Sequence, residues 1–366
     1  MSTSSFFPGI KLCEQFYREA VQPILDRHFP QVKHAAALIG DGSEVLGFDD
    51  ELSTDHDWGP RVMLFVEEEN QPHAEQIIEV LAQELPYEFH SYPTHWTDPD
   101  TNDNGTQVLQ SVKAGPINHR VTVQTIRNFV LEHLGFDIEQ DLEPADWLTF
   151  SEQRLLTLTS GAIYHDAIGL EERRSRFAYY PRDVWLYLLA AGWARIGEDE
   201  HLMGRAGMVG DEVGSAIIGA RLVRDIMRLC FLMEKTYAPY PKWFGTAFKR
   251  LPGAQELWPV LQGALCADHW QQREQFLVKA YEQLVIRHNA LQLTRQFPEQ
   301  TISFFGRPFQ VIELHGFSGV LLEQIEDPRV KHIATQSPRG SLDLLSDNTN
   351  LLSNPRWRPL IRHLYE

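Results

Sequence analysis

Two short apolar runs, residues 35–39 and 62–66, enclose a Gly42-Ser43 pair and an Asp55-His56-Asp57 triplet. An apolar run that ends in glycines is typical of a buried strand leading into a turn. Backbone N–H groups in such a turn can bind phosphate oxygens. The triplet is expected to begin the second strand, which places both carboxylates on one face because strand side chains alternate. A phosphate site beside a Mg²⁺ site indicates phosphoryl or nucleotidyl transfer.

A Gly-Ser pair and an Asp-x-Asp motif are each common in proteins. The alternative interpretation is that Asp55 and Asp57 cap a loop in water. The combination favours a functional site, because neighbouring carboxylates raise each other's pKa and need a cation or hydrogen-bond donors. Ser43 is also a candidate N-cap for a short helix through Val45 and Leu46.

The spacing of apolar residues predicts an α+β protein. Helical spacing covers residues 11–28 and 74–85, and alternation predicts a strand over 119–126. With the two apolar runs, these segments predict a mixed sheet with helices within residues 1–150. Residues 151–366 are expected to form an all-α helical-bundle domain. Its predicted helices include 151–164, 181–191, 211–237, 255–266 and 270–293, whereas residues 91–107 are expected to form a long loop.

The charge balance limits the partners. A net charge of −17 over 366 residues argues against nucleic acid, because proteins dedicated to nucleic acids carry a basic surplus. A nucleotide and a small-molecule acceptor are the expected partners. Neither a membrane segment nor a secretory signal is expected. The three cysteines, Cys13, Cys230 and Cys266, lack metal-site spacing, so we expect reduced thiols in a cytoplasmic protein.

Three residues of the second half are candidates for the site, and two of them have a structural alternative. Arg205 carries the planar fork that can bind phosphate through two hydrogen bonds. Asp211 is a candidate general base, or the N-cap of the helix that follows it. Lys242 is a candidate for neutralising a phosphate, or a surface lysine beside Trp243.

Gly42-Ser43 with Asp55 and Asp57 is similar to the signature of the nucleotidyltransferase superfamily, which includes the aminoglycoside nucleotidyltransferases. Longer stretches of the sequence resemble the family catalogued as domain of unknown function 4037. The segments that carry this second resemblance are 47–60, 146–148, 179–185, 204–205, 210–211 and 237–243. The two resemblances together imply a nucleotidyltransferase-type mixed sheet followed by a helical domain.

The superfamily resemblance also implies roles for the residues of the signature. The backbone of Gly42 and the side chain of Ser43 would hold nucleotide phosphates, and Asp55 and Asp57 would bind Mg²⁺, or Mn²⁺ in its place. A third carboxylate is usual on a later strand, which here implies a position near Thr122. No acid stands there, and Glu88 is a weaker substitute.

The expected function is a Mg²⁺-dependent nucleotidyltransferase that transfers a nucleoside monophosphate from a nucleoside triphosphate to a hydroxyl or amine. ATP is the expected donor, which makes AMP the transferred group, and a small molecule is the expected acceptor. Two alternatives remain open. The absence of an acid near Thr122 favours a nucleotide-binding or regulatory protein without turnover, and a protein side chain could replace the small acceptor.

Overall fold

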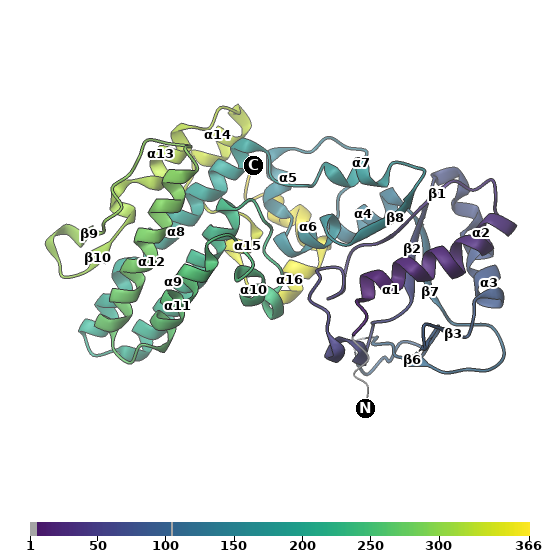
Figure 1. The fold of residues 1–366 in the computed structure, drawn as a ribbon. Coiled ribbons are helices and arrows are strands. Elements are labelled where there is room, and N and C mark those ends of the chain that lie inside the picture. Colours follow the sequence, from purple (N-terminus) through teal and green to yellow (C-terminus); the bar gives the residue numbers. More distant parts are fainter. Residues whose placement is uncertain (1–5, 104) are drawn as a thin grey trace. The chain divides into compact units, whose positions relative to one another are not determined.

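The computed structural model describes residues 6–103 and 105–366, which form two compact units (Figure 1). Unit 1 extends to Asp141 and also includes Arg154–Ala178, whereas unit 2 comprises Leu142–Gln153 and Tyr179–Glu366. This division differs from the boundary predicted at residue 150, because the chain returns to the first unit to add a strand.

A mixed four-stranded sheet forms the centre of unit 1, in the order β7-β2-β1-β8. Strand β2 pairs antiparallel with β1 and parallel with β7, and β8 pairs antiparallel with β1. The α+β class with a mixed sheet is therefore confirmed. The four strands are β1 (His34–Leu38), β2 (Arg61–Val66), β7 (Arg120–Thr125) and β8 (Ala162–Asp166).

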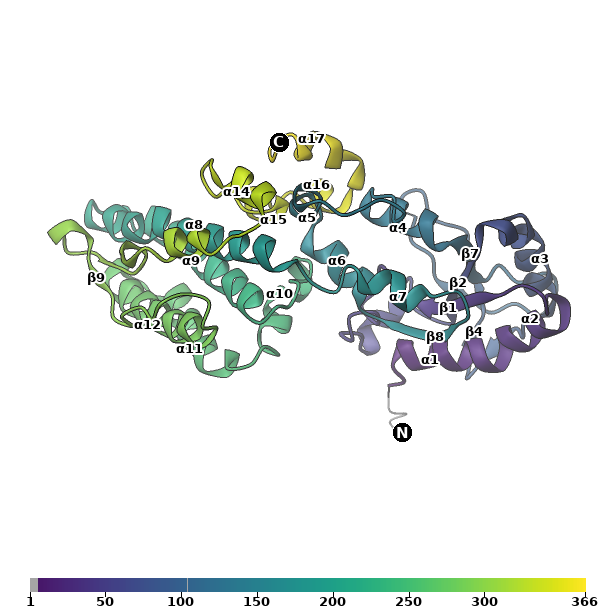
Figure 2. The same cartoon turned by 90° about the horizontal axis from the view of Figure 1, so that it is seen from above.

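One face of this sheet is apolar and is covered by helices (Figure 2). Leu64 of β2 and Val121 of β7 lie in a core with Phe16 and Leu81. The first covering helix is continuous but contains a π-helical turn that ends at Val21, two residues before Pro23, which has no backbone N–H to donate. The covering segments are α1 (Gly9–Phe16), the π turn (Tyr17–Val21), α2 (Gln22–His28) and α3 (Ala74–Glu84).

The other face of the sheet is only partly covered. Helix α4 (Ile126–Leu134) follows β7 directly, and the Thr125 hydroxyl accepts the backbone N–H of Asn128 as its N-cap. Phe129 of α4 packs edge-on against Phe65, with ring centroids 5.5 Å apart. The alternation of β7 places Arg120, Thr122 and Gln124 on this second face, where Thr122 is exposed.

The segment between β1 and β2 corrects two predictions. Residues 43–47 form a turn instead of a short helix capped by Ser43. Asp55 ends a 3₁₀ turn (Glu51–Asp55), so the expectation that the Asp55-His56-Asp57 triplet begins the second strand is wrong. The cause is local, because the Asp50 side chain accepts the backbone N–H groups of Leu52 and Ser53 and thereby closes a capping box.

The segment after residue 150 corrects a third prediction. The helix predicted over 151–164 ends early as α6 (Glu152–Thr159), and β8 follows. Gly161 makes this turn with φ +75°, and a Cβ there would collide with the carbonyl oxygen of Leu38. The remainder of unit 1 contains α7 (Leu170–Ser175), the 3₁₀ turn Glu68–His73 and the two-residue strands β3 (Glu88–Phe89), β4 (Tyr92–Pro93), β5 (His95–Trp96) and β6 (Leu109–Gln110).

Unit 2 is mainly helical, as predicted, but it also contains one short hairpin that an all-α domain would lack. Helix α8 packs along α9, and α9 in turn packs against α11 and α12. The long helices are α8 (Arg182–Met208), α9 (Glu212–Met233), α11 (Ala254–Cys266) and α12 (Trp270–Ala290). The shorter elements are α5 (Pro144–Thr149), α10 (Pro241–Phe248), β9 (Ile302–Ser303), β10 (Gln310–Val311), α13 (Phe317–Glu323), α14 (Pro328–Ala334), α15 (Leu342–Leu345), α16 (Thr349–Ser353) and α17 (Arg358–Arg362). Among the described helices, none has both the length and the apolar composition needed to cross a bilayer.

Candidate functional site

A pocket of about 350 Å³ opens on the partly covered face of the sheet in unit 1. It lies where β1 ends and β2 and β7 begin, because β2 runs antiparallel to β1 and parallel to β7. Three arginines and two carboxylates supply the charged groups of its lining. The lining residues are Leu38, Ile39, Gly40, Asp41, Arg61, Val62, Met63, Arg120, Thr122, Gln124, Phe129, Glu132, His133 and Arg154.

Two of the arginines are direct neighbours across parallel strands. Arg61 of β2 is in register with Arg120 of β7, and both line the pocket. Like charges in adjacent positions of a sheet repel each other. Burial lowers the pKa of Arg120, and the neighbouring charge of Arg61 lowers it further. An anion bound between the two side chains would relieve this repulsion.

Buried and half-buried acids hold both arginines in place from the sides. The carboxylate of Glu44, which is almost fully buried, accepts from Nε and Nη2 of Arg61 at 3.0 and 2.6 Å. Asp57 Oδ1 accepts from Arg120 Nη1 at 2.6 Å, and the Arg120 guanidinium lies 4.8 Å from the centre of the Trp96 ring. Fixed guanidinium groups lose less conformational entropy when they bind a ligand.

Gly42 makes room for the first of these ion pairs. Its φ is +145°, and a Cβ at this position would lie 2.5 Å from Arg61 Nη2 and 2.7 Å from Glu44 Oε2. The structure thus gives Gly42 a role in packing, in addition to the predicted one in phosphate binding. Ser43 is half-buried in the following turn, where its carbonyl oxygen accepts from the Phe48 backbone N–H, and its contact with a nucleotide remains a prediction.

We expect Gly42→Ala to lower the free energy of unfolding by about 2 kcal/mol or more, because the methyl group displaces Arg61 or Glu44 from a buried pair. Gly47→Ala is the matched control, since Gly47 also has a positive φ (+65°) but nothing lies within 4 Å of its Cβ position. Urea unfolding of the three proteins measures the difference. Equal losses in both variants would contradict the assigned packing role.

The two predicted metal ligands do not share a strand face. Asp57 has a φ of +52° and pairs with Arg120, while Asp55 is two-thirds exposed and pairs with His56 Nδ1 at 2.8 Å. Within residues 6–103 and 105–366, no three His, Cys, Asp or Glu side chains gather as a metal site. A metal ion at Asp55 and Asp57 would therefore need ligand oxygens from a phosphate and from water.

The strand expected to carry a third acid is β7, and Thr122 does line the pocket. Glu88 is no substitute within this sheet, because it lies in β3 and pairs with β4 in a separate two-stranded sheet. The carboxylates that line the pocket come from Asp41 and from Glu132 of α4 instead.

The three candidate site residues of unit 2 lie at helix ends or on a helix surface, at Arg205, Asp211 and Lys242. Arg205 is exposed in the last turn of α8. Asp211 is the N-cap of α9, where its Oδ1 accepts from the Gly214 backbone N–H at 2.7 Å, so the capping alternative is confirmed. Lys242 is exposed on α10, with its Nζ 4.9 Å from the centre of the Trp243 ring. Their roles in binding or catalysis remain predictions.

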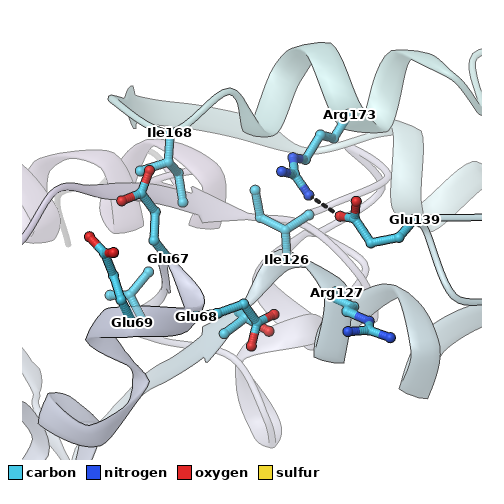
Figure 3. A pocket seen from close by; sticks show the side chains of 10 residues that line it. Glu67, Glu68, Glu69, Ile126, Arg127, Glu139, Ile168 and Arg173 are labelled. Carbon is cyan, nitrogen blue, oxygen red and sulfur yellow. Dashed lines mark hydrogen bonds and ion pairs between the residues drawn. The ribbon is translucent and has the colours of Figure 1, made fainter.

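A second pocket, of about 490 Å³, lies at the opposite end of the same strands (Figure 3). Glu67, Glu68 and Glu69 follow β2 there, and the ion pair of Arg173 and Glu139 (2.6 Å) lies across Ile126 from Glu67 and Glu69. Four glutamates line this pocket against two arginines. Its acidity makes it the less suitable of the two pockets for phosphate groups.

Sequence reasoning missed the three arginines and His133. The available signal was the position of Arg61 and Arg120, each of which starts a strand whose next residues alternate between the two faces. Register between strands that are far apart in the sequence was needed to bring them together. Arg154 and His133 carried no such signal, because each is one of several polar residues in its helix and nothing in the sequence sets it apart.

Comparison with known proteins gives a family match over the middle of the chain. Residues 147–244 match the model of a family described as "Domain of unknown function (DUF4037)", so the resemblance to that family is confirmed for this segment. Among solved structures, the chain is similar to a nucleotidyltransferase-like protein from Exiguobacterium sibiricum 255-15. The identity is 11% and the TM-score 0.32, over 76% of this chain and 78% of that one. No curated protein matches the sequence.

Proposed function

We propose that this protein binds a nucleoside triphosphate in the arginine-lined pocket of unit 1 and transfers its nucleotide part to a hydroxyl or amine of a small molecule. The observation that carries the proposal is the convergence of Arg61, Arg120 and Arg154 on one pocket, which Gly40 and Asp41 also line. Guanidinium groups bind phosphate oxygens through paired, charge-assisted hydrogen bonds. A triphosphate has enough charge and enough oxygens to engage several of them at once.

The arginines that line the pocket, and Asp57, which accepts from one of them, suit an attack on the α-phosphate. The arginines would orient the phosphate chain and stabilise the charge that develops as pyrophosphate leaves. Asp55 and Asp57 would hold Mg²⁺ or Mn²⁺; each carboxylate has two oxygens, and His56 or Arg120 engages one of them. A cation bound there supplies positive charge next to the phosphates.

The partners follow from the same chemistry. ATP is the proposed donor, and a small molecule is the proposed acceptor because the net charge of −17 disfavours nucleic acid. A membrane partner is not proposed, and the cytoplasmic location remains a prediction.

The second candidate function is nucleotide binding without turnover. Its support is the pairing of Asp57 with Arg120, together with a threonine at position 122 where the superfamily resemblance implies an acid. An arginine that neutralises a carboxylate weakens its attraction for a cation.

Pyrophosphate release separates the two candidates. With ATP, Mg²⁺ and a pool of small hydroxyl and amine compounds, we expect release that falls at least about 100-fold in Asp57→Asn. Asparagine tolerates the positive φ of Asp57 and can still accept from Arg120, so binding of ATP should persist. Glu68→Gln in the second pocket is the control and should leave release unchanged. Saturable ATP binding without pyrophosphate from any acceptor would favour the second candidate.

A further inference from the structure

His133 and Arg154 form a closed pair at the edge of the arginine-lined pocket. Arg154 Nη1 lies 3.1 Å from His133 Nδ1, and His133 Nε2 lies 2.9 Å from the backbone carbonyl oxygen of Arg154. An arginine side chain has donors only, so Nδ1 must be the unprotonated acceptor and the ring proton must sit on Nε2. The Nε2–H group then donates to the carbonyl. One imidazole is thus bonded to both the side chain and the backbone of the same arginine.

The surroundings of His133 keep the imidazole neutral and fixed. Its ring is buried and stacks on Phe129, with centroids 5.3 Å apart, and the Thr157 hydroxyl lies 3.1 Å from Nε2. Burial lowers the pKa of His133, the charge of Arg154 lowers it further, and Asp41 opposes the shift. Arg154 also pairs with Asp41, at the longer distance of 3.6 Å and with the Asp41 side chain 82% exposed. An ion pair with such an exposed partner restrains the Arg154 side chain only weakly.

We propose that His133 is a positioning residue, which holds the Arg154 guanidinium in the pocket and so raises its affinity for the phosphate chain without touching that chain. This inference rests on the proposed function of the pocket. An arginine side chain carries about 2 kcal/mol of rotamer entropy that an unheld side chain loses on binding. A side chain that His133 already holds loses less of it.

The test is a double-mutant cycle on the full chain, with ATP and inorganic triphosphate as probes in isothermal titration calorimetry. His133→Phe keeps the ring stack on Phe129 but removes the acceptor, and we expect both dissociation constants to rise about 10-fold. His133→Asn keeps an acceptor near the Nδ1 position and is expected to stay within about 3-fold of the unchanged protein. In an Arg154→Met background, His133→Phe should have no additional effect.

Two results overturn the inference, namely unchanged affinity in His133→Phe, or the same loss whether or not Arg154 is present. A protein that binds neither probe would instead refute the proposed function of the pocket. In that case nitrogen-15 NMR of the histidine rings still tests whether His133 Nδ1 accepts from Arg154. The same measurement replaces the affinity test if His133→Phe does not fold. At pH 7 we expect His133 as the neutral Nε2–H tautomer, whereas an Nδ1–H tautomer or an imidazolium would contradict the pairing.

Discussion

Replacing Arg120 by methionine is expected to weaken ATP binding by about 100-fold, which corresponds to about 3 kcal/mol or two charge-assisted hydrogen bonds. The folded state should change little. Removal of Arg120 ends its repulsion with Arg61, and the Asp57 carboxylate that loses its partner is 44% exposed and can be hydrated. We therefore expect a shift in the unfolding temperature of no more than about 3 °C.

Titration calorimetry and thermal unfolding of the same preparations measure both quantities. Arg127→Met is the matched control, since Arg127 is an arginine of unit 1 that lines the second pocket and pairs with Asp137. It should bind ATP as the unchanged protein does. Arg120→Lys keeps the charge without the fork, so an intermediate loss of about 10-fold is expected. Unaltered ATP binding in Arg120→Met would refute the phosphate site at these strands.

Raising the pH from 5 to 8.5 is expected to lower the free energy of unfolding of unit 2 by about 6 kcal/mol. Burial raises the pKa of Glu200 to about 7 and the pKa of Glu313 to about 8. In the unfolded chain both groups lose their protons near the ordinary glutamate pKa of 4.5. The folded state therefore binds more protons than the unfolded state between these values, and the stability present at low pH is lost as the pH rises through 7 and 8.

Glu313→Gln should remove a large part of this pH dependence. Oε1 of Glu313 accepts from the Ser318 backbone N–H at 3.0 Å, which the oxygen of glutamine can continue to do. Oε2 is buried and lacks a hydrogen-bond partner among the described residues, so an amide group can take its place. Glu299→Gln, at an exposed position, is the control. A pH profile of urea unfolding that is the same for Glu313→Gln and for the unchanged protein would contradict the assignment.

Local patterns were sufficient to predict the strands that build the pocket. A continuous apolar run predicted β2 and apolar alternation predicted β7, and the placement of Asp211 before α9 as its N-cap is also correct. These features depend on residues that are close in the sequence, where periodicity and capping determine the structure.

The charged contacts of the site could not be predicted in the same way. The capping box at Asp50 holds residues 51–55 in a 3₁₀ turn, so β2 does not extend back to the Asp55-His56-Asp57 triplet. Asp57 therefore pairs with Arg120 and does not share a strand face with Asp55. Strand β8 was missed because Tyr164 is its one buried residue and a helical pattern continued into it. The pairing of Arg61 with Arg120 depends on strand register, which neither segment encodes alone.

Strand β7 ends at Thr125 and helix α4 begins at Ile126, with no loop residue between them. Arg120 near one end and His133 near the other therefore belong to one uninterrupted length of backbone. Each inserted residue would turn α4 by about 100° relative to the strand, since an α-helix has 3.6 residues per turn. A single insertion at this junction would carry the imidazole away from Arg154 while leaving the composition of the pocket unaltered. The length of the chain at this point, as much as the identity of its side chains, thus sets the geometry of the site.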